Sequence, residues 1–211
     1  MPYVFSRSLR VTGNPVDSMA WSAKITEKVN QIAEIKVNLW TPVMSPQINT
    51  LTWAAVVDDL AALTATDEKL MADSGYLDLV TEGNKFNAGG GVDDALMQLV
   101  HADPDTPAEP AYATAVTAIL APGAFVDGVT LGVEIAQRAK AITGRPTSFA
   151  VSSTGVYGQV SWFQLHDSIE QVQAADEAIN ADADFGKLLD EKASKAYLAG
   201  QSTQTISRRV M

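Results

Sequence analysis

The sequence contains no cysteine and only two histidines, and these absences exclude several kinds of site. Without cysteine the chain forms no disulfide and uses no thiolate as a nucleophile or a metal ligand. The histidines, His101 and His166, have no second histidine or glutamate at the spacing that metal ligands take on a helix. We therefore predict neither a metal site nor a cofactor.

Positive charge is also scarce, with 15 lysines and arginines against 25 aspartates and glutamates, a net charge of −10. The basic residues are scattered, whereas nucleic acids and anionic membrane surfaces are bound by concentrated positive faces. The most apolar window, residues 117–136, is interrupted by Pro122, Gly123 and Asp127, so no transmembrane span is expected. The N-terminus lacks the pattern of a secretory signal. These features predict a cytoplasmic protein that has neither nucleic acid nor membrane as a partner.

What the sequence does contain is a repeat. Residues 52–80 align without gaps with residues 161–189, with eight identities in 29 positions. Average residue usage would give about two identities by chance. Upstream, one apolar helix stripe appears twice, over residues 21–32 and 131–142. The sequence therefore predicts a tandem duplication.

Each copy is predicted to have the order β-α-β-β-α-β, the ferredoxin-like split unit. Strands are expected over residues 3–11, 35–43, 49–57 and 92–100 in the first copy and over 111–120, 146–154, 158–166 and 202–210 in the second. The predicted domains are a first repeat over 1–102, a proline-rich linker over 103–112 and a second repeat over 113–211.

Several residues predict helix starts. Asn14, followed by Pro15, is typical of a helix N-terminus, and we expect it to cap the first helix. Asp58 and Asp167, each at the end of a third strand, are also predicted N-caps. Asp73 and Asp182 indicate a second start, so this region of each copy is expected to hold two short helices. The glycine-rich segment 87–94 is expected to be a helix stop and turn.

Two such units side by side resemble the dimeric α/β-barrel superfamily, and a tandem copy resembles a fused form of that dimer. The "LTW…DDL…L…EKLMAD…Y" run from Leu51 to Tyr76 is similar to the NIPSNAP and antibiotic-biosynthesis-monooxygenase-like branches. The resemblance implies an α+β fold in which two tandem ferredoxin-like repeats form a pseudo-dimeric α/β barrel. It also implies a ligand pocket between a sheet and its own helices.

The second copy offers the candidate catalytic residues. Because side chains alternate along a strand, Trp162, Gln164 and His166 share one face, where the first copy has Trp53, alanine and valine. His166 and Gln164 are candidate catalytic residues that could polarise a ligand carbonyl, with Trp162 as a ligand-binding wall. The alternative is that His166 is partly solvated at the strand end or helps to cap the following helix.

The first copy offers candidate ligand-binding residues. Arg7 falls on the apolar face of its strand, with Phe5 and Leu9, and an unpaired buried guanidinium is costly. It could bind a carboxylate ligand, pair with a carboxylate across the interface between the copies, or be exposed. Trp40, matched with Phe149 of the second copy, and Trp53 either line a pocket or belong to the core.

Three functions remain open. The first is a cofactor-independent monooxygenase or isomerase of a small hydrophobic molecule, and the second a non-catalytic module for a small ligand or a protein. The third is a haem protein, against which the resemblance itself counts. Its haem-degrading branch has an early-strand asparagine where this chain has Ser6 or Ser8, and a helix histidine where this chain is aliphatic. The chain is expected to be a monomer, as a pseudo-dimer, or a homodimer.

Overall fold

The computed structural model describes all residues, 1–211, and they divide into two compact units. The first unit comprises Met1–Leu96 together with Arg208–Met211, and the second comprises Met97–Ser207. Both units have the same order of elements: a strand, a long helix, two strands, shorter helices and a final strand. The division falls within the final strand of each unit, so the last residues of that strand are grouped with the other unit.

In the first unit the elements are, in chain order, β1 (Tyr3–Val11), α1 (Pro15–Ile32), β2 (Asn38–Val43), β3 (Thr50–Val57), α2 (Leu60–Ala72), α3 (Ser74–Gly83), the 3-10 turn η1 (Asn84–Phe86) and β4 (Asn87–His101). In the second unit they are β5 (Tyr112–Ile119), α4 (Phe125–Thr143), β6 (Thr147–Ser152), β7 (Gln159–His166), α5 (Ile169–Ala181), α6 (Ala183–Leu188), the π-helical turn η2 (Leu189–Ala193), α7 (Ser194–Ala196) and β8 (Thr203–Arg209).

Within the first unit the strands hydrogen-bond in the order β4-β1-β3-β2, and within the second in the order β8-β5-β7-β6, so the two units have equivalent sheets. The pairings run antiparallel, and equivalent residues face each other: Arg7 lies opposite Trp53, and Val116 lies opposite Trp162. The predicted α+β fold class, with antiparallel strands in each unit, is confirmed.

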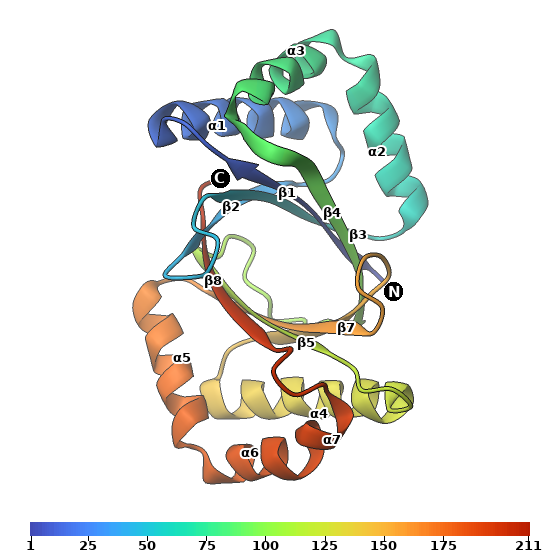
Figure 1. The fold of residues 1–211 in the computed structure, drawn as a ribbon, viewed down its shortest axis with the longest axis vertical. Coiled ribbons are helices and arrows are strands. Elements are labelled where there is room, and N and C mark those ends of the chain that lie inside the picture. The colour runs from blue at the N-terminus through green and yellow to red at the C-terminus, as the bar shows by residue number, and fades with distance from the viewer. The chain divides into compact units, whose positions relative to one another are not determined.

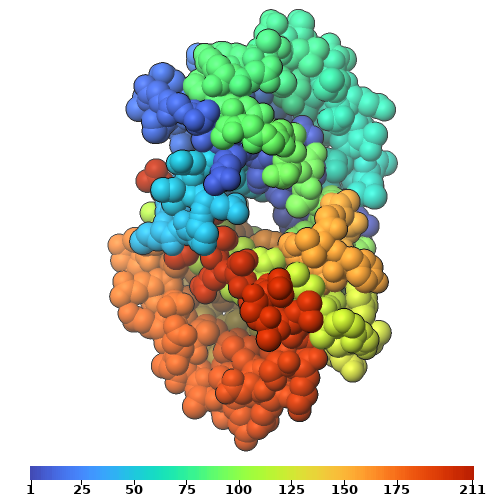
Figure 2. Space-filling model, in the orientation of Figure 1, coloured from blue at the N-terminus to red at the C-terminus, as the bar shows by residue number.

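The helices of each unit lie on one face of its own sheet (Figure 1). In the space-filling view the side chains of these helices cover that face (Figure 2). The buried apolar side chains form one cluster per unit, between sheet and helices. This burial removes apolar surface from water, which is the main favourable term in folding. No helix is both long and apolar enough to cross a membrane.

Three of the predicted helix starts are confirmed. The side chain of Asn14 accepts a hydrogen bond from the Val16 amide at 2.9 Å, with Pro15 as the first helical residue. Asp73 caps α3 and Asp182 caps α6 in the same way. Each carboxylate accepts a hydrogen bond from a backbone amide of the first turn. These contacts satisfy amides that have no partner within the helix.

The caps predicted at Asp58 and Asp167 are wrong by one residue. Asp59 caps α2, accepting from the Ala62 amide at 2.8 Å, and Ser168 caps α5. The strands end at Val57 and His166 as predicted, and one further residue, Asp58 or Asp167, lies between the strand and the cap. In both copies two residues with capping side chains follow each other, and the sequence does not indicate which of them takes the extended backbone that precedes the helix.

The glycine-rich segment also differs from its prediction. Gly89, Gly90 and Gly91 lie inside β4 and not in a turn before it, and their φ angles are 91°, 108° and 80°. Residues with a side chain rarely adopt such angles, so this stretch of strand requires glycine. The helix stop itself is the 3-10 turn η1, three residues upstream.

Candidate functional site

The first unit contains a pocket of about 440 Å³ between its sheet and its helices. Strands β1, β3 and β4 and helices α1, α2 and α3 all contribute to its walls. Most of the lining side chains are apolar, and they include Phe5, Leu9, Trp21, Ile25, Trp53 and Leu63. This is the place in the unit that the resemblance to α/β barrels implies for a ligand.

One position beside the tryptophan of the third strand has a larger side chain in the second unit. On β2, Leu39 lies opposite Trp53, whereas on β6 the larger Phe149 lies opposite Trp162. The ring centroids of Phe149 and Trp162 are 5.2 Å apart. A methyl group added at Gly132 of α4 would come within 2.2 Å of the Phe149 ring, so that ring fills the space up to the helix backbone.

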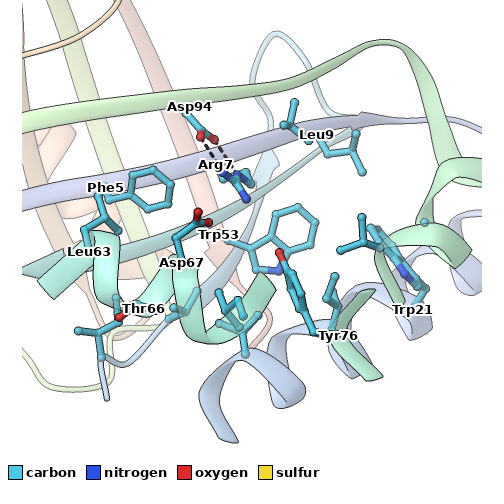
Figure 3. A pocket seen from close by; sticks show the side chains of 18 of the residues that line it. Phe5, Arg7, Leu9, Trp21, Trp53, Leu63, Thr66, Asp67, Tyr76 and Asp94 are labelled. Atoms are coloured by element: carbon cyan, nitrogen blue, oxygen red, sulfur yellow. Dashed lines mark hydrogen bonds and ion pairs between the residues drawn. The ribbon is translucent and has the colours of Figure 1, made fainter. Parts of the chain in front are cut away.

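Arg7 is held at the edge of the pocket by Asp94. Alternation along β1 puts Phe5, Arg7 and Leu9 on the face that looks toward the helices. The Nε and Nη2 atoms of Arg7 donate to the two carboxylate oxygens of Asp94, on the neighbouring strand β4, both at 2.7 Å (Figure 3). These bonds raise the pKa of Arg7, outweighing the lowering effect of burial, so the guanidinium stays charged.

Two further polar groups lie beside this ion pair. Figure 3 shows Asp67 of α2 and Tyr76 of α3 with their oxygen atoms directed toward Arg7. Both residues line the pocket, and both act electrostatically on the guanidinium. The pocket is therefore apolar over most of its wall and polar at one place, which is the usual composition of a small-molecule site.

Trp53 is a fixed wall of this pocket. Its Nε1 donates to the Thr26 hydroxyl of α1 at 2.8 Å, and that hydroxyl donates to the Ser22 carbonyl at 2.6 Å. The ring of Trp21 meets Trp53 edge-on, with centroids 5.9 Å apart. The indole N–H is thus satisfied by the protein, and what Trp53 offers a ligand is its apolar ring.

Trp40, in contrast, lies on the other face of the sheet. Leu39 is the residue of β2 that faces Trp53, so its neighbour Trp40 points away from the pocket. Leu39 therefore occupies the position in the first unit that Phe149 occupies in the second. The sequence had paired Phe149 with Trp40, one residue further along.

Trp162 and Gln164 share a face of β7, as predicted, but each is bonded to the protein around it. The Nε1 of Trp162 donates to the Gly132 carbonyl at 2.8 Å, and the Nε2 of Gln164 donates to the Thr147 hydroxyl at 2.9 Å. Neither residue lines the pocket of the first unit. Their polar atoms anchor β7 to its neighbours.

His166 is buried, with 1% of its surface exposed. Its Nε2 lies 3.3 Å from the Thr114 hydroxyl, and its Nδ1 is buried without a hydrogen-bond partner. Burial, with a smaller contribution from the charge of Arg145, lowers the pKa of His166 to about 4. The ring is therefore neutral at pH 7, and His166 is not one of the residues that line the pocket.

The structure thus places two predicted residues, Arg7 and Trp53, at one pocket and leaves the others outside it. The pocket also contains Asp67, Tyr76 and Asp94, which were not predicted from the sequence. Tyr76 could have been found, because it aligns with Phe185 and so adds a hydroxyl group at a buried position. No group of three or more histidine, aspartate or glutamate side chains is arranged to hold a metal ion.

No family model and no curated protein matches this sequence. Solved structures do resemble it. A candidate monooxygenase of Fusobacterium nucleatum has a TM-score of 0.71 at 9% identity, over 100% of this chain and 93% of its own. A candidate monooxygenase of Lactobacillus acidophilus and an anthrone oxidase-like protein each have a TM-score of 0.67 at 10% identity. Both cover 99% of this chain, and the matches span 93% and 92% of their own chains.

Proposed function

We propose that this chain, which has the dimeric α/β-barrel fold of the ferredoxin-like superfamily, binds a small, largely apolar molecule in the pocket of its first unit. The observation that carries the proposal is the pocket itself: about 440 Å³, walled by aromatic and aliphatic side chains, with its polar groups gathered at one place. Pockets for small molecules typically have volumes of roughly 300–1,000 Å³ and this composition.

The neutral fluorescent probe N-phenyl-1-naphthylamine tests this binding. Its emission rises when it enters an apolar site, so a titration gives its dissociation constant. The variant Leu63→Trp places a larger side chain on the pocket wall, and Leu60→Trp is its matched control, because Leu60 is exposed on the same helix and does not line the pocket. We expect Leu63→Trp to weaken binding about tenfold, roughly 1.4 kcal/mol, and Leu60→Trp to leave it unchanged. Equal affinity in both variants, or no binding by the wild type, would refute the proposal.

A second candidate function is catalysis on the bound molecule, as a cofactor-independent monooxygenase or an isomerase. The observation that favours it is the placement of the Asp67 carboxylate and the Tyr76 hydroxyl beside the Arg7–Asp94 pair. Both reactions can begin with removal of a proton from the substrate. Asp67 is the candidate base and Tyr76 the candidate donor to a developing oxyanion.

Anthrone, named in one of the structural neighbours, is a suitable probe substrate for this second function. Anthrone and dioxygen give anthraquinone and water. One oxygen atom becomes bonded to the methylene carbon of the ring and the other leaves as water, and the substrate supplies the electrons. Oxygen uptake above the uncatalysed background would be measured for the wild type, for Asp67→Asn and for Asp176→Asn, its counterpart in the second unit. A base role predicts a loss of about a hundredfold in Asp67→Asn alone. Background uptake in the wild type leaves anthrone excluded as a substrate, and full activity in Asp67→Asn excludes the base role.

We further propose that the chain arose by tandem duplication of one ferredoxin-like repeat, over residues 1–102 and 113–211. The equal order of elements and of strands in the two units supports this, as does the equivalent pairing of Trp53 and Trp162.

A further inference from the structure

The charged residues that line the pocket do not balance. Arg7 contributes one positive charge, while Asp94 and Asp67 contribute one negative charge each. No lysine or histidine lines the pocket, so its polar place carries a net charge of −1. Asp94 uses both of its carboxylate oxygens on Arg7, which leaves the Asp67 carboxylate as the excess charge.

Asp67 and Tyr76 both lack a partner for their side-chain oxygen atoms. Neither makes a side-chain hydrogen bond within the protein, although 92% of the surface of Tyr76 is covered, its exposed fraction being 8%. The Tyr76 hydroxyl is directed into the pocket beside Arg7 (Figure 3). Because the Tyr76 hydroxyl has no partner within the protein, it is available for a hydrogen bond to a group that enters the pocket.

From these contacts we infer that the pocket selects an apolar molecule that carries a protonated amine, with the ammonium group between the Asp67 carboxylate and the Tyr76 hydroxyl. An ammonium group donates hydrogen bonds and accepts none, and both of these oxygens can accept. The inference rests on the proposed binding function, and it adds the chemical class of the ligand.

The aromatic walls favour the same class of ligand. Trp53 and Tyr76 present rings next to the polar place, and cations are attracted to the faces of such rings. An anionic ligand, in contrast, would have to compete with Asp94 for Arg7 and would lie close to Asp67. The bidentate Arg7–Asp94 pair, with both bonds at 2.7 Å, makes that exchange unfavourable.

Three naphthalene probes of similar size and different charge test the inference: 1-naphthylmethylamine, which is protonated at pH 7, neutral 1-naphthylmethanol and anionic 1-naphthoate. Their dissociation constants would be measured by displacement of N-phenyl-1-naphthylamine at low ionic strength. We expect the amine to bind about fivefold more tightly than the alcohol, and the naphthoate to bind most weakly, since Asp67 is exposed and such ion pairs are worth about 1 kcal/mol or less.

Two variants locate the effect. Asp67→Asn should remove the preference for the amine over the alcohol, whereas Asp176→Asn, the counterpart in the second unit, should leave that preference as it is in the wild type. Asp94→Asn frees Arg7, and should raise the affinity for 1-naphthoate. If the alcohol binds to the wild type and the amine binds no more tightly, the inference is overturned while the binding function stands. If none of the three probes displaces the fluorophore, or the fluorophore itself does not bind, the proposed function is refuted and the inference with it.

Discussion

The stability of this protein should depend on pH through one buried side chain, His166. Its pKa is lowered to about 4 from an ordinary value of 6.5, chiefly because burial disfavours the charged ring. Between these two pH values the unfolded chain binds a proton at His166 and the folded chain does not. Acidification therefore favours unfolding: the stability that the neutral ring contributes is present above pH 6.5 and is lost as the pH falls toward 4.

The size of this effect follows from the two pKa values. A difference of about 2.5 units corresponds to roughly 3 kcal/mol, of which roughly 2.5 kcal/mol is lost between pH 7.5 and pH 4.5. Urea unfolding followed by tryptophan fluorescence would give the free energy of unfolding of the wild type and of His166→Gln at both values. The carboxylates titrate in both proteins, so the difference between the two pH dependences isolates His166.

We expect the wild type to lose roughly 2–3 kcal/mol more than His166→Gln over this range. Equal losses would show that the ring titrates normally and would refute the account of His166 as a neutral buried side chain. If the variant does not fold, the ring protons of His166 in the wild type can be followed by NMR during a pH titration. A midpoint above pH 6 would refute the same reasoning.

Three other changes have definite expected outcomes. Gly83→Ala should destabilise the protein by about 1–3 kcal/mol in urea unfolding, because the added methyl would come within 2.2 Å of the Trp21 ring; an unchanged midpoint would contradict this close contact. Tyr197→Phe should cost about 1–3 kcal/mol, because its hydroxyl donates to the buried Gly128 carbonyl at 2.6 Å, whereas Tyr76→Phe should cost less than 1 kcal/mol, its hydroxyl having no partner; the reverse order would mean that the two hydroxyls are wrongly assigned. Haemin should keep the absorbance spectrum of the free compound when added to the protein, because no histidine lines the pocket, and a protein-bound Soret band would contradict the site as described.

Much of the fold could be predicted because two segments of the sequence resemble each other. The eight identities between residues 52–80 and 161–189 carry strand, cap and helix positions from one unit to the other, and the resulting order of elements is the one observed. Asn14, Asp73 and Asp182 were predictable as caps because each has a side chain that suits the start of a helix. At Asp58-Asp59 and Asp167-Ser168 two residues with such side chains follow each other, and the end of the strand does not decide between them.

The candidate site was only partly predictable. Arg7 and Trp53 could be found because alternation along a strand fixes the face to which each side chain points. Asp94 could not be found in this way, because its pairing with Arg7 depends on which strand lies beside β1. The strand pattern correctly puts Gln164 and His166 on one face of β7. It does not reveal that Gln164 donates to Thr147 or that His166 is buried.

The central claim is that a small apolar molecule binds in the first unit, between its sheet and its helices. Methyl NMR spectra recorded during a titration with N-phenyl-1-naphthylamine test it most directly, since Ile25, Val29 and Leu63 line the pocket, and Ile135 and Val172 report on the second unit. We predict ring-current shifts at the first three residues and unchanged signals at the other two. Shifts confined to the second unit, or the absence of shifts at saturating probe, would contradict the claim.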